Sequence, residues 1–144
     1  MISQAEANEQ LMRRWFDEVW NRKQESAVDE MMAADCVAYG LGDADAVVRG
    51  PEQFKEFHRG FCGAFPDLQI AVEDVIASGD RVAARWRMTG THLGGHLGFP
   101  PTAKRVSLDG VSIAVIEDGK LKEGWNMMDM GHFFESLRGD GARF

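Results

Sequence analysis

Several features of membrane or nucleic-acid-binding proteins are missing from this 144-residue chain. No apolar stretch approaches the roughly 20 residues that a membrane-spanning helix needs. No run of Lys or Arg with interleaved aromatic residues occurs, and the formal net charge is -7, so a surface that follows phosphate groups is not expected. The N-terminus has neither the basic start nor the apolar segment of a signal peptide. We therefore expect a cytoplasmic protein with no membrane or nucleic-acid partner.

Cysteine is scarce, since the chain has only Cys36 and Cys62. Both lie among apolar residues without the spacing of a zinc or redox motif, so two buried, reduced thiols are expected and neither is a candidate nucleophile. His92 and His96 are four residues apart, which on a helix could face a metal. The two glycines between them disfavour a regular helix, and no acid follows at ligand spacing. We expect no metal site.

The apolar residues that are present recur at helical spacing in the first half of the chain. Leu11, Trp15 and Val19 form one stripe, and Pro51 is suited to the first position of a later helix that Pro66 ends. The length fits one domain over residues 1–144, with a frayed tail over 138–144. The predicted helices cover residues 4–20, 26–32 with Ser26 at its start, 51–65 and 132–137.

From Leu68 onward the apolar period changes to two, which is typical of strands. The predicted strands cover residues 36–39, 68–73, 82–89, 106–116 and 121–130. Helices first and hairpins afterwards indicate an α+β fold, with helices laid on one face of a curved, mostly antiparallel sheet.

Asp118-Gly119 between two apolar runs predicts a two-residue hairpin turn. If Glu117 then faces Lys120, an unbroken ladder places Val111, Ile113 and Val115 on the same face as Gly124, Asn126 and Met128, opposite Trp125 and Asp129. Both faces would carry apolar residues, although helices can cover only one of them. We therefore expect a homodimer through the outer face of the sheet, with Ile113 in the interface.

A lone acid follows the apolar segment that starts at Trp125. Strand alternation places Asp129 on the side to which Trp125 and Met127 project. A carboxyl held against indole and thioether surface could exchange protons near neutral pH, as a general acid or base requires. A capping role is the alternative, because Asp129 directly precedes the last predicted helix and aspartate is a common N-cap.

An ordered set of short motifs resembles the SnoaL-like polyketide cyclase family of the NTF2-like superfamily. The motifs are Trp20-Asn21-Arg22, Gly50-Pro51-Glu52, Phe65-Pro66-Asp67, Gly79 to Trp86, Gly90-Thr91-His92, Gly98 to Thr102, Glu117 to Lys120 and Trp125 to Asp129. The resemblance implies a cone of curved sheet closed by helices around a deep apolar pocket, usually dimeric and without cofactor. In characterised cyclases of this family, an aspartate near the end of the last strand is the acid/base of an intramolecular aldol ring closure, and Asp129 matches that position.

The candidate catalytic residues are therefore Asp129 and His92, which precedes a glycine-rich segment suited to a mobile lid. The alternative for His92 is an ordinary loop histidine. Aromatic and apolar residues at helical or strand period form the core, and some of them must also form the pocket wall. The residues expected to line the pocket and contact a substrate are Trp15, Tyr39, Phe57, His58, Phe61, Trp86, Trp125, Met127 and Phe133.

Three functions are compatible with these residues. The first is a cofactor-free polyketide cyclase-like lyase or isomerase that acts on a small, apolar, carbonyl-bearing molecule. The second is a noncatalytic module that only binds such a molecule. The third is an epoxide hydrolase or dehydratase of the same fold, for which Asn126 is the nearest additional polar group, although alternation directs it away from Asp129.

Overall fold

The computed structural model describes residues 1–138, and over these residues the chain has the expected α+β architecture. Its helical segments are α1 (Gln4–Arg14), the π-helix η1 (Trp15–Asn21), α2 (Glu25–Met31), α3 (Gly50–Ala64) and α4 (Met130–Arg138). Its strands are β1 (Met32–Tyr39), β2 (Val47–Arg49), β3 (Gln69–Ser78), β4 (Arg81–Thr91), β5 (Arg105–Glu117) and β6 (Lys120–Met128).

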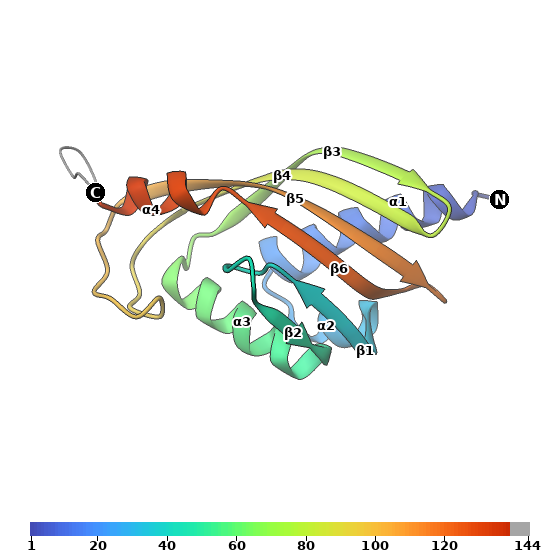
Figure 1. Cartoon of the computed structure of the whole chain (residues 1–144), viewed down its shortest axis with the longest axis horizontal. Helices are drawn as coiled ribbons and strands as arrows, with labels where there is room; N and C mark the ends of the chain where they lie inside the picture. Colours follow the sequence, from blue (N-terminus) through green and yellow to red (C-terminus); the bar gives the residue numbers. More distant parts are fainter. Residues whose placement is uncertain (139–144) are drawn as a thin grey trace.

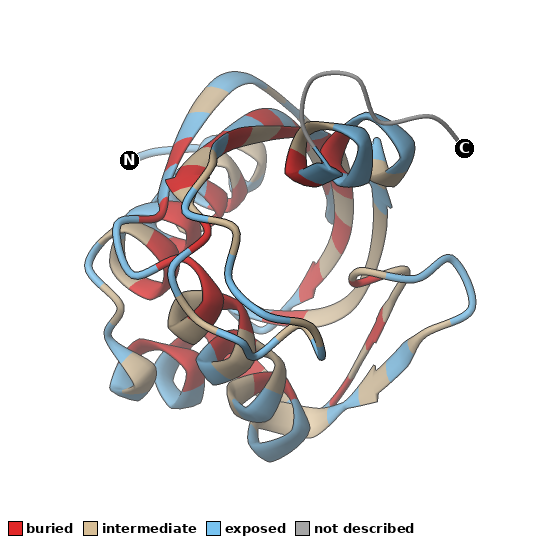
Figure 2. Cartoon of the chain, turned by 90° about the vertical axis from the view of Figure 1, so that its left-hand side faces the viewer, coloured by how far each residue is buried: buried red, intermediate tan, exposed pale blue. Residues whose placement is uncertain are grey.

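The six strands form one sheet in the order β2-β1-β6-β5-β4-β3. All neighbours are antiparallel except β1 and β6, which are parallel. The sheet curves around the helices, with α1 and η1 against β3 and β4, and α3 against β1 (Figure 1). Figure 2 shows the same molecule end-on, with the buried segments turned toward the interior of a cone.

The register of the β5–β6 hairpin differs from the unbroken ladder expected from the sequence. Glu117 does face Lys120, but Ile116 pairs with Leu121 while Val115 pairs with Glu123, so Lys122 is an extra residue on β6. Such a β-bulge shifts every later pair by one and exchanges the faces. The expectation that Ile113 shares a face with Asn126 is therefore wrong, because Ile113 pairs with Trp125 on the outer face.

The first predicted helix is confirmed, but its last part is a π-helix in place of an α-helix. Ser3 caps the start of α1, where its hydroxyl accepts the Glu6 N–H at 3.1 Å. Pro51 lies in the first turn of α3, as the sequence predicts. Ser26 does not open α2, which begins at Glu25 after Gln24 and has no side-chain cap.

Two other boundaries differ from expectation. Strand β2 forms after a polar stretch that had no strand signal, and it pairs with the end of β1. Helix α4 includes Arg138, so the expected frayed tail does not begin there, and its other residues, 139–144, lie outside the described part of the chain. No helix within residues 1–138 is long and apolar enough to span a membrane.

Candidate functional site

An apolar pocket of about 90 Å³ lies between the inner face of the sheet and the helices. Its wall comes from α1, η1, α3 and five of the strands, and nearly all of it is hydrocarbon, aromatic ring or thioether. The helical part of the wall consists of Met12, Trp15, Phe16, Trp20, Phe54, Phe57 and Phe61. The sheet contributes Met32, Cys36, Ala38, Ile70, Trp86, Met88, Leu108, Ser112, Ala114, Leu121, Gly124, Asn126 and Met128, and the loops contribute Leu41 and Leu68. Ile113 and Glu123 also border the pocket, although strand alternation places both on the outer face.

The π-helix explains why two tryptophans five residues apart both reach this pocket. At 3.6 residues per turn, side chains five apart on an α-helix would diverge by about 140°. The wider π turn brings them closer to one face, and Trp15 and Trp20 both contact Phe54, with ring centroids 5.0 and 5.9 Å apart. The helical wall is therefore almost entirely aromatic, and such a surface is typical of sites for small apolar molecules.

A chain of hydrogen bonds forms the polar part of the sheet wall. The Trp86 indole N–H lies 3.0 Å from Ser112 Oγ, and that hydroxyl lies 2.7 Å from Asn126 Oδ1. The Asn126 amide nitrogen donates to the Tyr39 carbonyl oxygen at 3.0 Å. Ser112 and Asn126 pair across β5 and β6 on the inner face, so this row of hydrogen bonds lies at the pocket surface.

Glycine at position 110 makes this arrangement possible. Trp86 pairs with Gly110 across β4 and β5, and a Cβ at that glycine would lie 2.3 Å from the indole ring. The ring therefore lies across β5 where a side chain would otherwise stand, and its N–H reaches Ser112 two residues further along the strand. Gly40 has a related role, since a Cβ there would lie 2.2 Å from the Asn126 carbonyl oxygen.

Asp129 does not lie inside the pocket, and the expectation that it would is wrong. Its side chain is exposed and caps α4, where Oδ1 accepts the His132 N–H at 3.2 Å. It borders a shallow surface depression that also includes Arg87 and Asp109, which form an ion pair with 2.6 and 3.2 Å contacts. The strand ends at Met128 and the helix follows at once, so the chain turns the carboxylate into the cap position. Asp129 is not part of the pocket wall.

His92 is fully buried at the end of β4 but also lies outside the pocket wall. Its Nδ1 accepts the Thr102 backbone N–H at 3.1 Å, so the neutral ring carries its proton on Nε2. That N–H has no hydrogen-bond partner among residues 1–138. The main chain of His92 also pairs with Ala103 and Lys104, at 2.8 and 2.9 Å. His92 therefore joins the two ends of the β4–β5 loop, and its predicted catalytic role gains no support from its position.

His58 is buried on α3 but does not contribute to the pocket wall. Its Nε2 donates to the Val19 carbonyl oxygen at 2.6 Å, which satisfies a backbone acceptor of the π-helix. Burial lowers the pKa of His58, and the bond to Val19 opposes that shift only in part. The residue supports η1 and lies outside the pocket wall in which the sequence analysis placed it.

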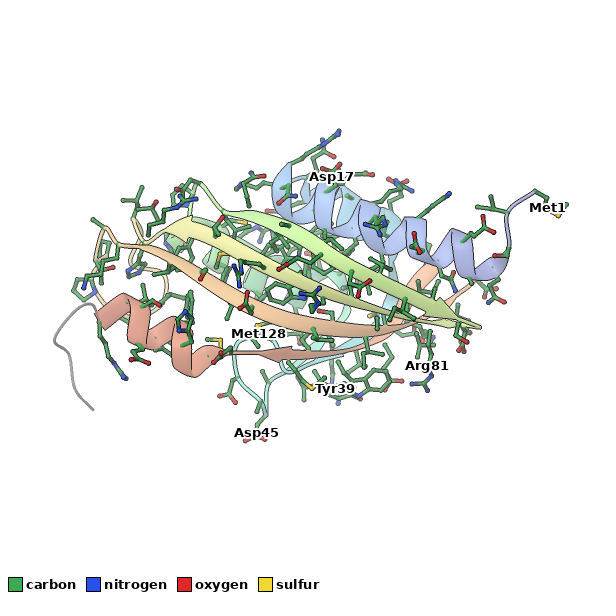
Figure 3. All side chains as sticks on the ribbon, turned by 90° about the horizontal axis from the view of Figure 1, so that it is seen from above. Met1, Asp17, Tyr39, Asp45, Arg81 and Met128 are labelled. Carbon is green, nitrogen blue, oxygen red and sulfur yellow. The ribbon has the colours of Figure 1, made fainter. Side chains whose placement is uncertain are left out.

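Four other expected wall residues lie elsewhere. Tyr39 and Trp125 stack on the outer face with ring centroids 6.1 Å apart, and the Arg81 guanidinium lies 5.6 Å from the Trp125 ring. In Figure 3, the labelled Tyr39 and Arg81 side chains extend from the same side of the molecule. Met127 is exposed on that outer face. Phe133 of α4 is fully buried against Phe61 and Phe65, in the core beside the pocket.

Ionisable groups near the pocket are few. Burial raises the pKa of the Cys36 thiol to about 11, so the thiol stays protonated; Cys62 is half-buried, and burial also raises its pKa. Glu123 borders the pocket, yet it pairs with Val37 and Val115, which alternate with inward-facing residues, so its side chain belongs to the outer face. Within residues 1–138, no three His, Cys, Asp or Glu side chains gather as metal ligands do.

Four of the residues expected to line the pocket are part of its wall, namely Trp15, Phe57, Phe61 and Trp86, and their contact with a substrate stays a prediction. It missed Ser112 as a site residue because a single serine in an apolar strand carries no signal of its own. Asn126 was considered, but alternation directed it away from Asp129, the residue expected inside the pocket. The Asp118-Gly119 turn predicted the first pair of the hairpin correctly. The residues around Lys122 carry no sequence signal for the bulge that pairs Asn126 with Ser112.

Comparisons with known proteins agree with this geometry. Residues 10–136 match the family model of the SnoaL-like polyketide cyclases. A candidate SnoaL-like polyketide cyclase from Jannaschia sp. CCS1 has a TM-score of 0.85 at 26% identity, over 95% of this chain and 96% of that chain. The candidate hydroxylase AclR from Streptomyces galilaeus has a TM-score of 0.82 at 31% identity, over 94% and 98% of the two chains. These likenesses confirm the NTF2-like cone.

The same architecture also occurs in a protein named for a different reaction. An LEH-like epoxide hydrolase from M. tuberculosis has a TM-score of 0.73 at 15% identity, over 94% of this chain and 92% of that chain. At that identity the likeness concerns the fold alone. None of the curated proteins matches this chain.

Proposed function

This chain belongs to the SnoaL-like polyketide cyclase family, and we propose that it binds a small, apolar, carbonyl-bearing molecule in its internal pocket and promotes ring closure of that molecule. The observation that carries the proposal is the pocket itself, with aromatic helices on one side and a short polar chain on the other. Such a site holds the apolar body of a ligand by burial and orients it by a few polar contacts.

Ring closure in this pocket would depend mainly on the shape of the site. A proton between two carbonyl groups is already acidic, so the reaction needs modest base strength and chiefly needs the two reacting carbons held together. Rigid aromatic walls supply that constraint. The proposal needs no metal or nucleotide.

A noncatalytic binding function is the second candidate, and a specific observation favours it. Within residues 1–138, Cys36 is the only ionisable side chain that the strand and helix faces direct toward the pocket. Its raised pKa makes it a poor base. An epoxide hydrolase or dehydratase would need a further group to activate water or a leaving hydroxyl, and the described wall offers only Ser112 and Asn126.

The experiment uses ethyl 3,7-dioxooctanoate (the dione) as a simple test substrate, because its C2 methylene lies between an ester carbonyl and a ketone carbonyl. A bond between that carbon and the C7 carbonyl carbon, followed by loss of water, gives ethyl 2-methyl-6-oxocyclohex-1-ene-1-carboxylate, whose conjugated absorbance reports turnover. Ala114→Phe should block binding and turnover, because Ala114 is buried in the pocket wall. Ala71→Phe is the matched control, since Ala71 is an exposed residue of β3, and it should change neither binding nor turnover.

The three possible results separate the candidates. Turnover above the buffer rate that Ala114→Phe abolishes supports a cyclase-type enzyme. Binding of the dione that Ala114→Phe abolishes, without turnover, supports the binding function. Binding that Ala114→Phe leaves intact contradicts a function of this pocket.

A further inference from the structure

We infer that the Asn126 side-chain amide is the polar anchor of the pocket, and that its second N–H donates a hydrogen bond to the carbonyl oxygen of an uncharged ligand. This inference rests on the proposed function, since it names the chemical group that the same pocket recognises. It begins from the direction of the hydrogen-bond chain on the sheet wall.

The direction of that chain follows from its last member. The Tyr39 carbonyl oxygen can only accept, so the group facing it must be the amide nitrogen of Asn126. The amide oxygen then faces Ser112, whose hydroxyl must donate to it. The same hydroxyl accepts the Trp86 indole N–H, which is a donor only. The donor and the acceptor of each of these three hydrogen bonds are therefore assigned.

One donor remains unused after this assignment. An amide nitrogen carries two N–H groups, and Asn126 gives one of them to Tyr39. The other has no partner among residues 1–138, although the residue is part of the pocket wall. Since an unpaired donor in an apolar site is costly, a ligand oxygen that accepts from it gains selective affinity.

The surroundings of Asn126 also decide which oxygen fits. The amide is held on two sides, by Ser112 and by Tyr39, and Gly40 packs against its backbone carbonyl. It is thus oriented before a ligand arrives. No charged side chain on the described inner wall could neutralise an ion, so a carboxylate or ammonium ligand would be buried unpaired. The ligand class is therefore an uncharged, largely apolar ketone or related carbonyl compound.

A pair of probes of nearly equal shape tests this assignment. Acetophenone and α-methylstyrene are both flat one-ring molecules, and they differ in having C=O or C=CH₂ beside the ring. Their affinities for the whole chain can be followed by tryptophan fluorescence, because Trp15, Trp20 and Trp86 all border the pocket.

Asn126→Leu should weaken acetophenone binding by about fivefold to tenfold, the effect of one net hydrogen bond. It should change the affinity for α-methylstyrene by less than about twofold, because that molecule has no acceptor. Asn8→Leu is the matched control, since Asn8 is a buried asparagine outside the pocket that donates to Gly79 O at 3.1 Å. It should leave the ratio of the two affinities unchanged.

A measurement on the unaltered protein decides the matter even if Asn126→Leu fails to fold. The carbonyl stretching band of bound, ¹³C-labelled acetophenone should lie at lower wavenumber than in an alkane, as expected for a hydrogen-bonded ketone. An alkane-like band, or an equal effect of Asn126→Leu on both probes, would overturn the inference while the apolar pocket keeps its proposed function. Failure of both probes to bind would overturn the two proposals together.

Discussion

At the scale of single residues, the structure separates the acid expected to act in the site from the groups that border it. Asp129 caps α4 in solvent, while Ser112 and Asn126 face the apolar interior. The carboxylate is well suited to its position, because an acidic side chain at a helix N-terminus satisfies a free N–H and complements the helix dipole.

Asp129→Ala should lower the free energy of unfolding by about 0.5–2 kcal/mol, the usual effect of removing an N-cap. Asp129→Asn should be nearly neutral, because asparagine caps as well as aspartate. Urea titration measures both changes, and turnover of the dione should persist in both variants. A folded Asp129→Asn protein that binds the dione but has lost turnover by orders of magnitude would return Asp129 to a catalytic role.

His58 gives the protein a pH dependence with a definite sign. Its pKa in the folded state lies below the ordinary value, chiefly because the ring is buried. Between the folded pKa and the unfolded pKa of about 6.5, only the unfolded chain binds the proton, so stability falls as the pH is lowered. This contribution is fully present above about pH 6.5 and is lost progressively down to the folded pKa.

His58→Gln should therefore flatten the dependence of unfolding free energy on pH below that point. His132→Gln provides the comparison, since His132 is exposed on α4. Urea titrations at a series of pH values measure the slopes. Equal slopes for the wild type and His58→Gln would show that the buried ring does not govern acid stability.

At the scale of secondary-structure elements, local irregularities position the site. The π-helix brings Trp15 and Trp20 to one wall, and the bulge at Lys122 turns Asn126 inward to meet Ser112. A regular helix and an unbroken hairpin would give a different pocket. Gly110 also positions the site, because the absence of a side chain there leaves room for the Trp86 indole.

Gly110→Ala should destabilise the protein by about 1–3 kcal/mol, the usual effect of overpacking a core. The new methyl group would lie 2.3 Å from the Trp86 ring, so the ring must leave Ser112 or the strands must separate. Gly60→Ala is the control, since a Cβ there meets nothing within 4 Å in α3, and it should stabilise the helix by about 0.5–1 kcal/mol. If denaturant unfolding finds the Gly110 variant as stable as the wild type, the packing described for Trp86 is wrong.

The sequence predicted regular elements well and their irregularities poorly. Helical spacing of Phe54, Phe57 and Phe61 located α3, and alternation through Val82 and Trp86 located β4, because burial of one face imposes those periods. A π turn or a bulge changes the period by a single residue, which leaves no comparable pattern. Trp125 and Met127 were expected on the pocket side because the bulge was not foreseen: alternation along the end of β6 holds, but the face opposite to theirs points inward. Asp129 follows the end of the strand and caps α4.

At the scale of the whole molecule, both faces of the curved sheet carry apolar residues, but the helices cover only one of them. Helices cover the inner face, whereas the outer face carries Ile113, Met127 and the stacked pair Tyr39 and Trp125. Met127 and Ile76 are 59% and 68% exposed, which leaves large apolar side chains in contact with solvent in a single chain. The homodimer through this face stays a prediction.

Ile113→Glu should dissociate that dimer without unfolding the subunit, because a charge would be buried without a partner in the interface. Sedimentation velocity measures the mass, and circular dichroism confirms the fold. Leu93→Glu is the control, since Leu93 is an exposed apolar residue in the β4–β5 loop and not on the sheet. If Ile113→Glu associates as the wild type does, the predicted dimer through the outer face of the sheet is wrong.

The most direct measurement for the whole account is a crystal structure of the protein soaked with 4-bromoacetophenone, with the bromine located by anomalous scattering. The bromine should lie inside the cone among Trp15, Trp20 and Phe54, with the ketone oxygen within hydrogen-bond distance of the Asn126 amide nitrogen. A bromine found only beside Asp129 in the outer depression, or no bound molecule at all, would contradict a function centred on the internal pocket.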